Sequence, residues 1–405
     1  MDPGDIAWVS TCTALVMLMI PALAFFYAGL VRKKNLLMTL VQCFVALAVV
    51  SLVWALWGYS LAFGRSIGGV IGDLSLFGLN NVGVAPNINL APKIPELLFF
   101  AFQLKFAAIT PALIIGALVG RFRFRSFLIF LVLWSTLIYS PIAHWVWNPG
   151  GWLHSVGAID FAGGLVVHVS AGVSALAAAI VIGRRRGLEK REEFKPSNVP
   201  YVMLGAGLLW FGWFGFNAGS ALAANTLAVS ALVVTNLAAA AGAISWMAVD
   251  WAVRGKPSAV GLAVGAVCGL VAITPASGFV TPAASMVIGL VAGILSNLVS
   301  NWRANRTRVD DALDVFACHG MSGIWGSLAT GLFATLVVNS AGTNGLFYGN
   351  PQLIVSQSLA VLVVAAFSFV GTFLLLKFIN LFSKLRVSPE EEKKGLDEAM
   401  LGEEL

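Results

Sequence analysis

Long apolar runs alternate with short polar segments along the whole chain of 405 residues. A helix that crosses the hydrocarbon core of a bilayer needs about 20 predominantly apolar residues. By this criterion the pattern predicts eleven membrane-spanning helices, at residues 6–31, 38–63, 96–120, 126–146, 161–183, 200–223, 226–252, 258–274, 280–302, 314–338 and 353–384. We therefore expect an all-α integral membrane protein with a transmembrane domain at 1–385 and a tail at 386–405.

The composition supports this class of protein. Hydrophobic residues make up 59% of the chain and charged residues 11%, whereas charged residues make up about 25% of an ordinary soluble domain. No basic residue precedes the first apolar run, which is also too long for the core of a signal peptide. We interpret it as a retained span, and we expect no nucleic-acid partner for such a chain.

The basic residues are concentrated on one side of the predicted bundle. Of the 25 Lys and Arg residues, 22 follow odd-numbered spans, and only Arg65 and Lys93 lie on the other side. The last, Lys105, lies within span 3. Lys and Arg concentrate in cytoplasmic loops. The sequence therefore predicts a multi-pass protein of the cell membrane, with the N-terminus outside and the C-terminus in the cytoplasm.

Two short patterns recur in the second half of the chain. Spans 3 and 8 both contain the sequence AITPA. Spans 5 and 10 share an Asp, a His eight residues later and a Gly four residues after that, which are Asp160, His168 and Gly172, and Asp311, His319 and Gly323. Both pairs are five spans apart, and an odd offset reverses the direction of the chain through the membrane. The sequence thus predicts an inverted repeat of spans 1–5 and 6–10, with span 11 outside it.

The repeat places His168 and His319 at equivalent positions, and a pseudo-two-fold axis would bring them together near the centre. Ionisable side chains within a membrane are costly and are functional candidates by default. Histidine titrates near neutral pH and can relay protons. We therefore predict a functional pair. His144 and His154 have no such counterpart, and we interpret them as structural.

Aromatic and hydroxyl side chains add a second candidate site. Phe102 and Phe106 lie four residues apart on one helical face, and Ser220 follows Phe216 at the same spacing. Trp147 lies at the outer end of span 4. Aromatic faces attract cations and a hydroxyl group accepts hydrogen bonds. Together these side chains suit a small cation.

Segments along nearly the whole chain resemble the ammonium transporter (Amt/Mep/Rh) family. They are FFYAGLVRKKN, GYSLAFG, AFQLKFAAIT, SPIAHWVWNPGGWL, GAIDFAGGLVVHVSAG, LLWFGWFGFNAGSAL, ITPASGFV, RVDDALDVFACHG and LRVSPEEEKKGLDEAMLGE. Trp147 and GWFGFNAGSA are similar to the Amt branch rather than the Rhesus branch. The resemblance implies a homotrimer whose subunits each hold a pore for ammonium or ammonia, with methylammonium as an analogue, and a role in nitrogen uptake.

The resemblance also implies roles for individual residues. It implies an outer ammonium site of Trp147, Ser220, Phe102 and Phe106, a phenyl gate of Phe106 over Phe216, and a hydrogen-bonded pair of His168 and His319 in an apolar pore. Asp160 would order the outer end of span 5, and Trp213 and Thr274 would support the pore. The tail would be regulatory and would contact a neighbouring subunit and a PII-type signal protein.

Three positions depart from the family pattern. Gly120 stands where the resemblance leads us to expect an acidic residue and a cytoplasmic salt bridge. Leu401 replaces an expected tail histidine, which weakens the case for PII control. Lys105 is not part of the pattern, and its spacing leaves open whether it faces the pore, faces another helix or extends outward.

Our hypothesis is that ammonium is recruited as a cation and crosses as ammonia, with a separate proton transfer along the histidines that makes transport electrogenic. An electroneutral ammonia channel and an ammonium sensor are the alternatives. A bis-histidine haem protein would need more than one basic anchor within the membrane, so we expect no cofactor and no metal. No base lies near Ser220 in a pattern that would make the protein an enzyme.

Overall fold

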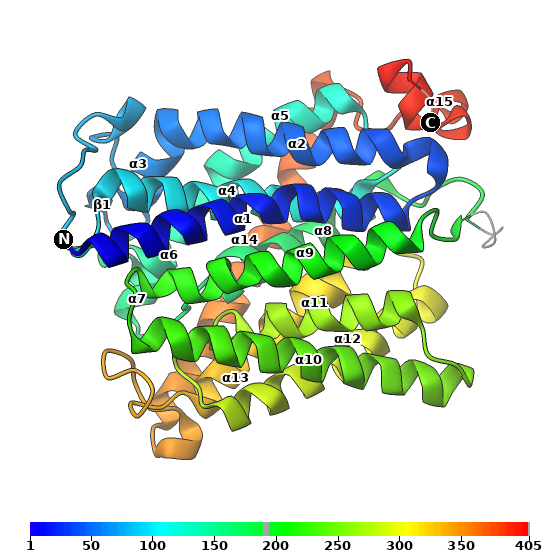
Figure 1. Cartoon of the computed structure of the whole chain (residues 1–405). Helices are drawn as coiled ribbons and strands as arrows, with labels where there is room; N and C mark the ends of the chain where they lie inside the picture. Colours follow the sequence, from blue (N-terminus) through cyan, green and yellow to red (C-terminus); the bar gives the residue numbers. More distant parts are fainter. Residues whose placement is uncertain (189–193, 404–405) are drawn as a thin grey trace.

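The computed structural model describes residues 1–188 and 194–403, and Lys190 and Arg191, two of the basic residues assigned above to the cytoplasmic side, lie outside these ranges. Within them, eleven helical elements run roughly along one direction and form a bundle (Figure 1). They are α1 (Pro3–Leu30), α2 (Leu36–Val53) with η2 (Trp54–Gly58) and α3 (Tyr59–Phe63), α4 (Glu96–Leu118), α5 (Phe124–Trp134) with η4 (Ser135–Tyr139) and α6 (Ser140–Trp147), η5 (Gly164–Val169) with α8 (Ser170–Ile182), α9 (Val199–Ala218), α10 (Thr226–Arg254), α11 (Ala259–Ile273), α12 (Pro282–Arg306), η8 (Phe316–Met321) with α13 (Ser322–Phe333), and α14 (Pro351–Phe382).

Short elements connect these helices. They are η1 (Lys33–Asn35), the antiparallel strands β1 (Ser66–Ile67) and β2 (Ile71–Gly72), η3 (Phe77–Leu79), α7 (Trp152–Ser155), η7 (Gly219–Ala221) and η9 (Leu346–Tyr348). In the described ranges, nine helical stretches are long and apolar enough to span a membrane, and α11 and α13 are shorter. The prediction of an all-α membrane protein is confirmed.

Polar side chains fix where the helices begin. Asp2, Asn198, Asn225, Ser258, Thr281 and Asn350 each accept a hydrogen bond from a backbone N–H group in the first turn of the helix that follows. Proline occupies one of the first two positions of α1, α9, α12 and α14. Unpaired N–H groups are costly at a membrane, so caps and prolines define the ends of the apolar helices.

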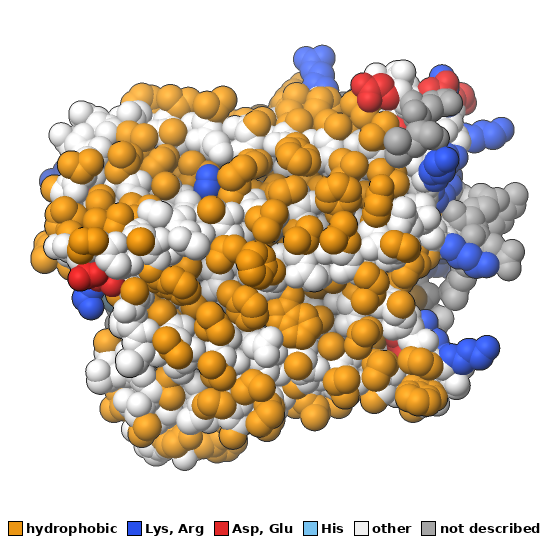
Figure 2. Space-filling model, in the orientation of Figure 1, with side chains coloured by type: hydrophobic (Ala, Val, Ile, Leu, Met, Phe, Trp, Pro, Cys, Tyr) orange, Lys and Arg blue, Asp and Glu red, His pale blue; other side chains and the backbone are white. Residues whose placement is uncertain are grey.

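The two halves of the repeat meet at the centre of the bundle. The first helices of the halves, α1 and α9, pack along each other, and α10 packs on α11 and α12 (Figure 1). Glycines in α11 and α12 permit this close packing, because a Cβ atom on Gly269 or Gly289 would collide with the backbone at Ala238. The middle of the molecular surface is covered by hydrophobic side chains, and Lys and Arg gather mainly at the end where the C-terminus lies (Figure 2).

The tail folds back onto this basic end. Its short helices are α15 (Pro389–Lys394) and η10 (Asp397–Leu401). The Asp397 carboxylate accepts hydrogen bonds from the N–H groups of Leu37 and Met38, at 3.0 and 2.8 Å, where α2 begins. Leu401 packs in a small apolar cluster with Met38 and Val387. The residue that replaces the expected tail histidine therefore belongs to an apolar contact between tail and bundle.

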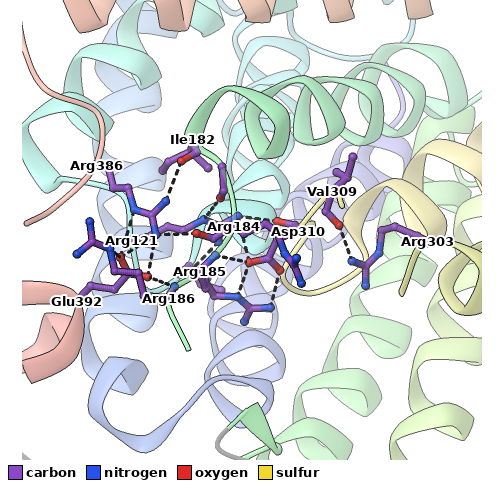
Figure 3. A network of polar contacts seen from close by, with 12 residues as sticks. Arg121, Ile182, Arg184, Arg185, Arg186, Arg303, Val309, Asp310, Arg386 and Glu392 are labelled. Atoms are coloured by element: carbon purple, nitrogen blue, oxygen red, sulfur yellow. Dashed lines mark hydrogen bonds and ion pairs between the residues drawn. The ribbon is translucent and has the colours of Figure 1, made fainter. Parts of the chain in front are cut away.

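A polar network joins the tail to the loops after α4, α8 and α12 (Figure 3). Arg386 Nη2 donates to Glu392 Oε2 at 2.8 Å, and Arg185 Nη2 donates to Asp310 Oδ1 at 2.8 Å. Arg121, fully buried, donates to the backbone oxygen of Asp310 at 2.6 Å. Burial lowers the pKa of Arg121 to about 10, which still leaves it charged at neutral pH.

The local backbone explains why glycine, rather than an acidic residue, stands at the neighbouring position 120. Its φ of +77° lies in the left-handed region, which glycine adopts without strain. A Cβ atom there would also lie 2.8 Å from the side-chain nitrogen of Asn35. In this chain Arg121 lies 3.8 Å from the Asp310 carboxylate. An ion pair with Asp310 thus takes the place of the expected salt bridge to position 120.

Candidate functional site

The two histidines of the repeat meet in the centre of the bundle. Their Nδ1 atoms lie 3.3 Å apart, and their rings are nearly parallel, with centroids 5.4 Å apart and planes 21° apart. Both side chains are buried. His168 lies in the π-helical turn η5 and His319 in the π-helical turn η8, a kind of turn that often occurs at functional sites. The predicted proximity of the histidines is therefore present in the structure.

Each π-helical turn is held by an aspartate of the repeated pattern. The Asp160 carboxylate accepts hydrogen bonds from the N–H groups of four successive residues, Gly163, Gly164, Leu165 and Val166, at 2.7–3.2 Å. In the second half, Asp311 Oδ2 accepts the N–H of Phe316 at 2.7 Å. A carboxylate at the start of a helix also interacts favourably with the helix dipole. Asp160 thus caps the start of η5.

The glycines of the pattern let the two histidine segments approach each other. A Cβ atom on Gly172 would lie well under 3.0 Å from the backbone nitrogen of Gly320, which is too close for any real contact. A Cβ atom on Gly323 would lie 3.0 Å from the Cβ atom of His168. Each glycine therefore allows its helix to contact the histidine-bearing segment of the other half.

Asp311 makes stability depend on pH. Burial and the charge of Asp314 raise the pKa of Asp311 to about 6, although Arg303 and two N–H groups act in the opposite direction. An acid with a raised folded-state pKa stabilises the fold fully below its unfolded pKa, about 3.9, and this contribution is lost as the pH rises through the folded pKa. We expect stability to fall between about pH 4 and pH 6 by about 3 kcal/mol.

The comparison of Asp311→Asn with the wild type checks this expectation. Asparagine keeps an oxygen for the N–H of Phe316 and removes the charge. In detergent, the melting temperature of the variant minus that of the wild type should therefore rise from pH 4 to pH 7. A difference that is constant with pH, or that falls, would contradict the assignment.

The space around the histidines is narrow and apolar. The ring of His168 stacks on Trp213, with centroids 5.4 Å apart, and on Phe216 at 5.9 Å. Trp213 Nε1 donates to Thr274 Oγ1 at 2.9 Å, which fixes the indole ring. The cavity here has a volume of about 10 Å³ and is lined, besides the histidines, Trp213 and Phe216, by Met19, Leu23, Phe26, Ile109, Leu113, Val167, Leu209 and Val267. A cavity of this size holds about one water molecule.

All four predicted ligands of the outer site line one cavity of about 170 Å³, namely Phe102, Phe106, Trp147 and Ser220. The Trp147 ring is perpendicular to the Phe106 ring, with centroids 5.9 Å apart. Its Nε1 donates to the backbone oxygen of Asp160 at 2.9 Å. Asp160 therefore positions both the start of η5 and an aromatic wall of the outer cavity.

Two phenyl rings lie between the outer cavity and the narrow cavity. Phe106 and Phe216 have ring centroids 4.3 Å apart. Phe106 lines the outer cavity. Phe216 lines the narrow cavity and stacks on the ring of His168. The predicted gate pair is thus in contact, and a small molecule would have to displace at least one ring to pass.

Other singled-out residues lie elsewhere. His144 is buried, with its ring nitrogens 2.8 Å from Ser66 Oγ and from the Ala62 oxygen, whereas His154 is exposed on α7. Lys105 lines neither cavity. Asp310 and Asp314, near η8, bind arginines, as in the 2.7 Å contact between Arg303 Nε and Asp314.

The sequence analysis missed several lining residues. The apolar pore lining gave no signal, because apolar residues occupy every face of these helices. Gln103 did give a signal in the sequence, because it is a polar residue inside a predicted span and next to Phe102. It lines the outer cavity, and its buried Oε1 atom has no hydrogen-bond partner among the residues that the structure describes.

With this geometry established, comparisons with known proteins are informative. Residues 7–405 match the model of the Ammonium Transporter Family. The chain is 49% identical to an ammonium transporter of Bacillus subtilis, over 100% of this chain and 98% of that protein. It is 47% identical to the ammonium transporter Amt1 of Archaeoglobus fulgidus, over 98% of this chain and 97% of that protein.

Solved structures are also similar. The crystal structure of Saccharomyces cerevisiae Mep2 has a TM-score of 0.89 and 38% identity, covering 96% of this chain and 89% of that one. A structure described as a sensor Amt protein has a TM-score of 0.90 and 32% identity, covering 98% of both chains.

Proposed function

This chain belongs to the ammonium transporter family, and we propose that it recruits ammonium at the outer aromatic cavity, removes one proton and passes ammonia between the phenyl rings into the pore. The observation that carries the proposal is the order of the two spaces. A wide cavity with aromatic walls and a hydroxyl group comes first, and a narrow apolar space with two histidines follows.

The outer cavity is suited to a small cation. Ser220 Oγ donates its hydrogen to the Phe216 oxygen at 2.9 Å, so its lone pairs are available to an N–H donor. The faces of Phe102, Phe106 and Trp147 supply cation–π attraction. These contacts favour ammonium, and they would also admit a cation of similar size such as potassium. Selectivity must therefore arise deeper in the pathway.

Deprotonation supplies that selectivity. Moving a bare ion into an apolar interior costs on the order of 20 kcal/mol in the idealised limit and several kcal/mol in practice. Removing a proton from an amine-like cation at pH 7 costs about 5 kcal/mol. The narrow cavity leaves little room for a hydration shell, so neutral ammonia is the form that fits. Potassium has no proton to lose and is excluded by the same step.

The histidine pair offers a route for the released proton. Its two Nδ1 atoms are within reach of a shared hydrogen bond, and His168 Nε2 has no partner among the described residues. A proton can be accepted on one ring and passed to the other, so the transport of ammonia together with a proton moves one net charge. This electrogenic mechanism is the one we propose.

Current measurements test it directly. The purified protein would be reconstituted on a solid-supported membrane and pulsed with ammonium, with potassium as the control ion. We expect a current with ammonium alone. A current with both ions would contradict the deprotonation filter, and no current with either would contradict electrogenic transport.

An electroneutral ammonia channel is the first alternative. It would make the interior of the vesicles alkaline without producing a current. A sensor is the second alternative, and the similarity to a sensor Amt protein favours it. A sensor would bind ammonium without a current and without a change of internal pH. The two alternatives therefore differ in the pH signal.

The assembly and orientation are also part of the proposal. We infer a homotrimer in the cell membrane, and the many hydrophobic side chains on the face of the bundle seen in Figure 2 support it. The distribution of Lys and Arg supports a cytoplasmic location for the basic end of the bundle and for the tail. A PII-type partner would meet a tail that is docked on α2, since Asp397 binds Leu37 and Met38. Contact of that docked tail with a neighbouring subunit belongs to the same proposal.

A further inference from the structure

Lys105 is a charged side chain within the membrane that the site does not use. It is half-buried on α4, nine residues or about 14 Å along the helix from Glu96. In the ranges that the structure describes, no hydrogen bond or ion pair satisfies its ammonium group. Lipid tails offer no acceptor, and the four-carbon stem is too short to carry the charge from this depth to the headgroups. The group therefore needs an acceptor from outside the subunit.

Asn236 is a complementary orphan on α10. It lies ten residues or about 15 Å from Thr226, the outer end of that helix, and its side chain is exposed. It makes no hydrogen bond within the described part of the chain. Of the described residues, it is the only exposed carboxamide or carboxylate more than five residues inside a membrane-spanning helix. Such a side chain facing lipid is unfavourable and commonly bonds across helices.

The two helices that carry these side chains lie apart in the subunit, on either side of α1 and α9 (Figure 1). The helix α4 packs with α1, α2 and α8, whereas α10 packs with α9, α11 and α12 (Figure 1). One copy therefore cannot join Lys105 to its own Asn236. A cyclic assembly places one face of each subunit against a different face of the next, so that every copy contributes both. The similar depths of the two residues match this arrangement.

We propose that Lys105 of one subunit donates a hydrogen bond to the side-chain oxygen of Asn236 in the neighbouring subunit. This inference rests on the trimer of the proposed function and identifies the faces that meet. The ammonium group supplies three donors and no acceptor, and the carboxamide oxygen supplies two lone pairs. The contact satisfies both groups inside the membrane, and it fixes which helices lie together.

Cross-linking of the full-length protein tests the contact. Lys105→Cys would be combined with Asn236→Cys and treated in detergent with a short bis-maleimide. The native cysteines are all buried, and each single variant controls for their reaction. The matched control combines Lys105→Cys with Leu362→Cys, because Leu362 is 68% exposed and lies eleven residues from the outer end of α14. We expect covalent dimers and trimers with Asn236→Cys and none with Leu362→Cys.

The outcomes separate this inference from the proposed function. Native mass and ammonium current would be measured on the wild type from parallel preparations. A trimer that carries current but gives no ladder with Asn236→Cys, or an equal ladder with Leu362→Cys, would overturn the contact alone. A wild type that carries current without being a trimer would overturn the assembly and the contact with it.

A second measurement covers the case in which cysteine variants fold poorly. Lys105→Met and Asn236→Leu each leave one polar group without a partner, and the double variant removes both. We expect each single variant to lower the dissociation temperature of the trimer by several degrees and the double variant to recover most of that loss. Strictly additive effects would show that the two residues do not interact.

Discussion

Gly172→Ala is expected to abolish ammonium transport and to destabilise the protein. The added methyl group would fall on the nitrogen and Cα atoms of Gly320, next to His319. Backbone atoms cannot rotate away as a side chain does, so the two histidine segments must separate. Overpacking of this kind costs about 1–3 kcal/mol. It would also pull apart the 3.3 Å contact between His168 and His319.

The matched control is another glycine of a membrane-spanning helix. Among the described residues, nothing beyond the neighbouring turns of α9 lies within 4 Å of the position that a Cβ atom on Gly207 would occupy, so Gly207→Ala should leave current and melting temperature unchanged. Current per amount of trimer and the melting temperature in detergent would be measured for both variants. If Gly172→Ala conducts like the wild type, the close approach of the two halves is not needed for function.

The sequence was informative wherever a polar residue interrupted an apolar background. The histidines, their aspartates and their glycines stood out because they recur at equal spacing in two apolar spans. The positions of Lys and Arg predict the direction of the spans, and that direction stays a prediction. These signals were sufficient for the bundle and for the meeting of His168 with His319.

The rest could not be obtained from the pattern. In a membrane protein, residues that face lipid, a neighbouring helix or a narrow cavity are all apolar, so Leu113 and Val267 could not be recognised as lining the narrow cavity. The π-helical turns depend on the carboxylates of Asp160 and Asp311, which act on backbone N–H groups rather than through periodicity. The Trp147 ring is held at the outer cavity by its hydrogen bond to the carbonyl oxygen of Asp160, and this contact joins two separate elements.

His168→Leu and His319→Leu are expected to remove the ammonium-evoked current while the pore stays open to ammonia. Leucine fills a similar space and keeps the cavity apolar, but it has no nitrogen to accept a proton. Loss of a general acid–base group typically lowers a rate by about 100- to 10,000-fold, and we expect at least about a 100-fold loss of current. The same proteoliposomes would carry a pH-sensitive dye, in which alkalinisation by ammonia should persist.

The two readouts distinguish proton transfer from simple blockage. A collapsed or blocked pore would remove the current and the dye signal together, whereas loss of the proton route removes the current alone. His154→Leu is the control, because His154 is exposed on α7, outside both cavities, and its current should be unchanged. A variant at His168 or His319 that kept the wild-type current would show that the proton takes another route. The 3.3 Å contact of the rings would then serve only to shape an apolar passage.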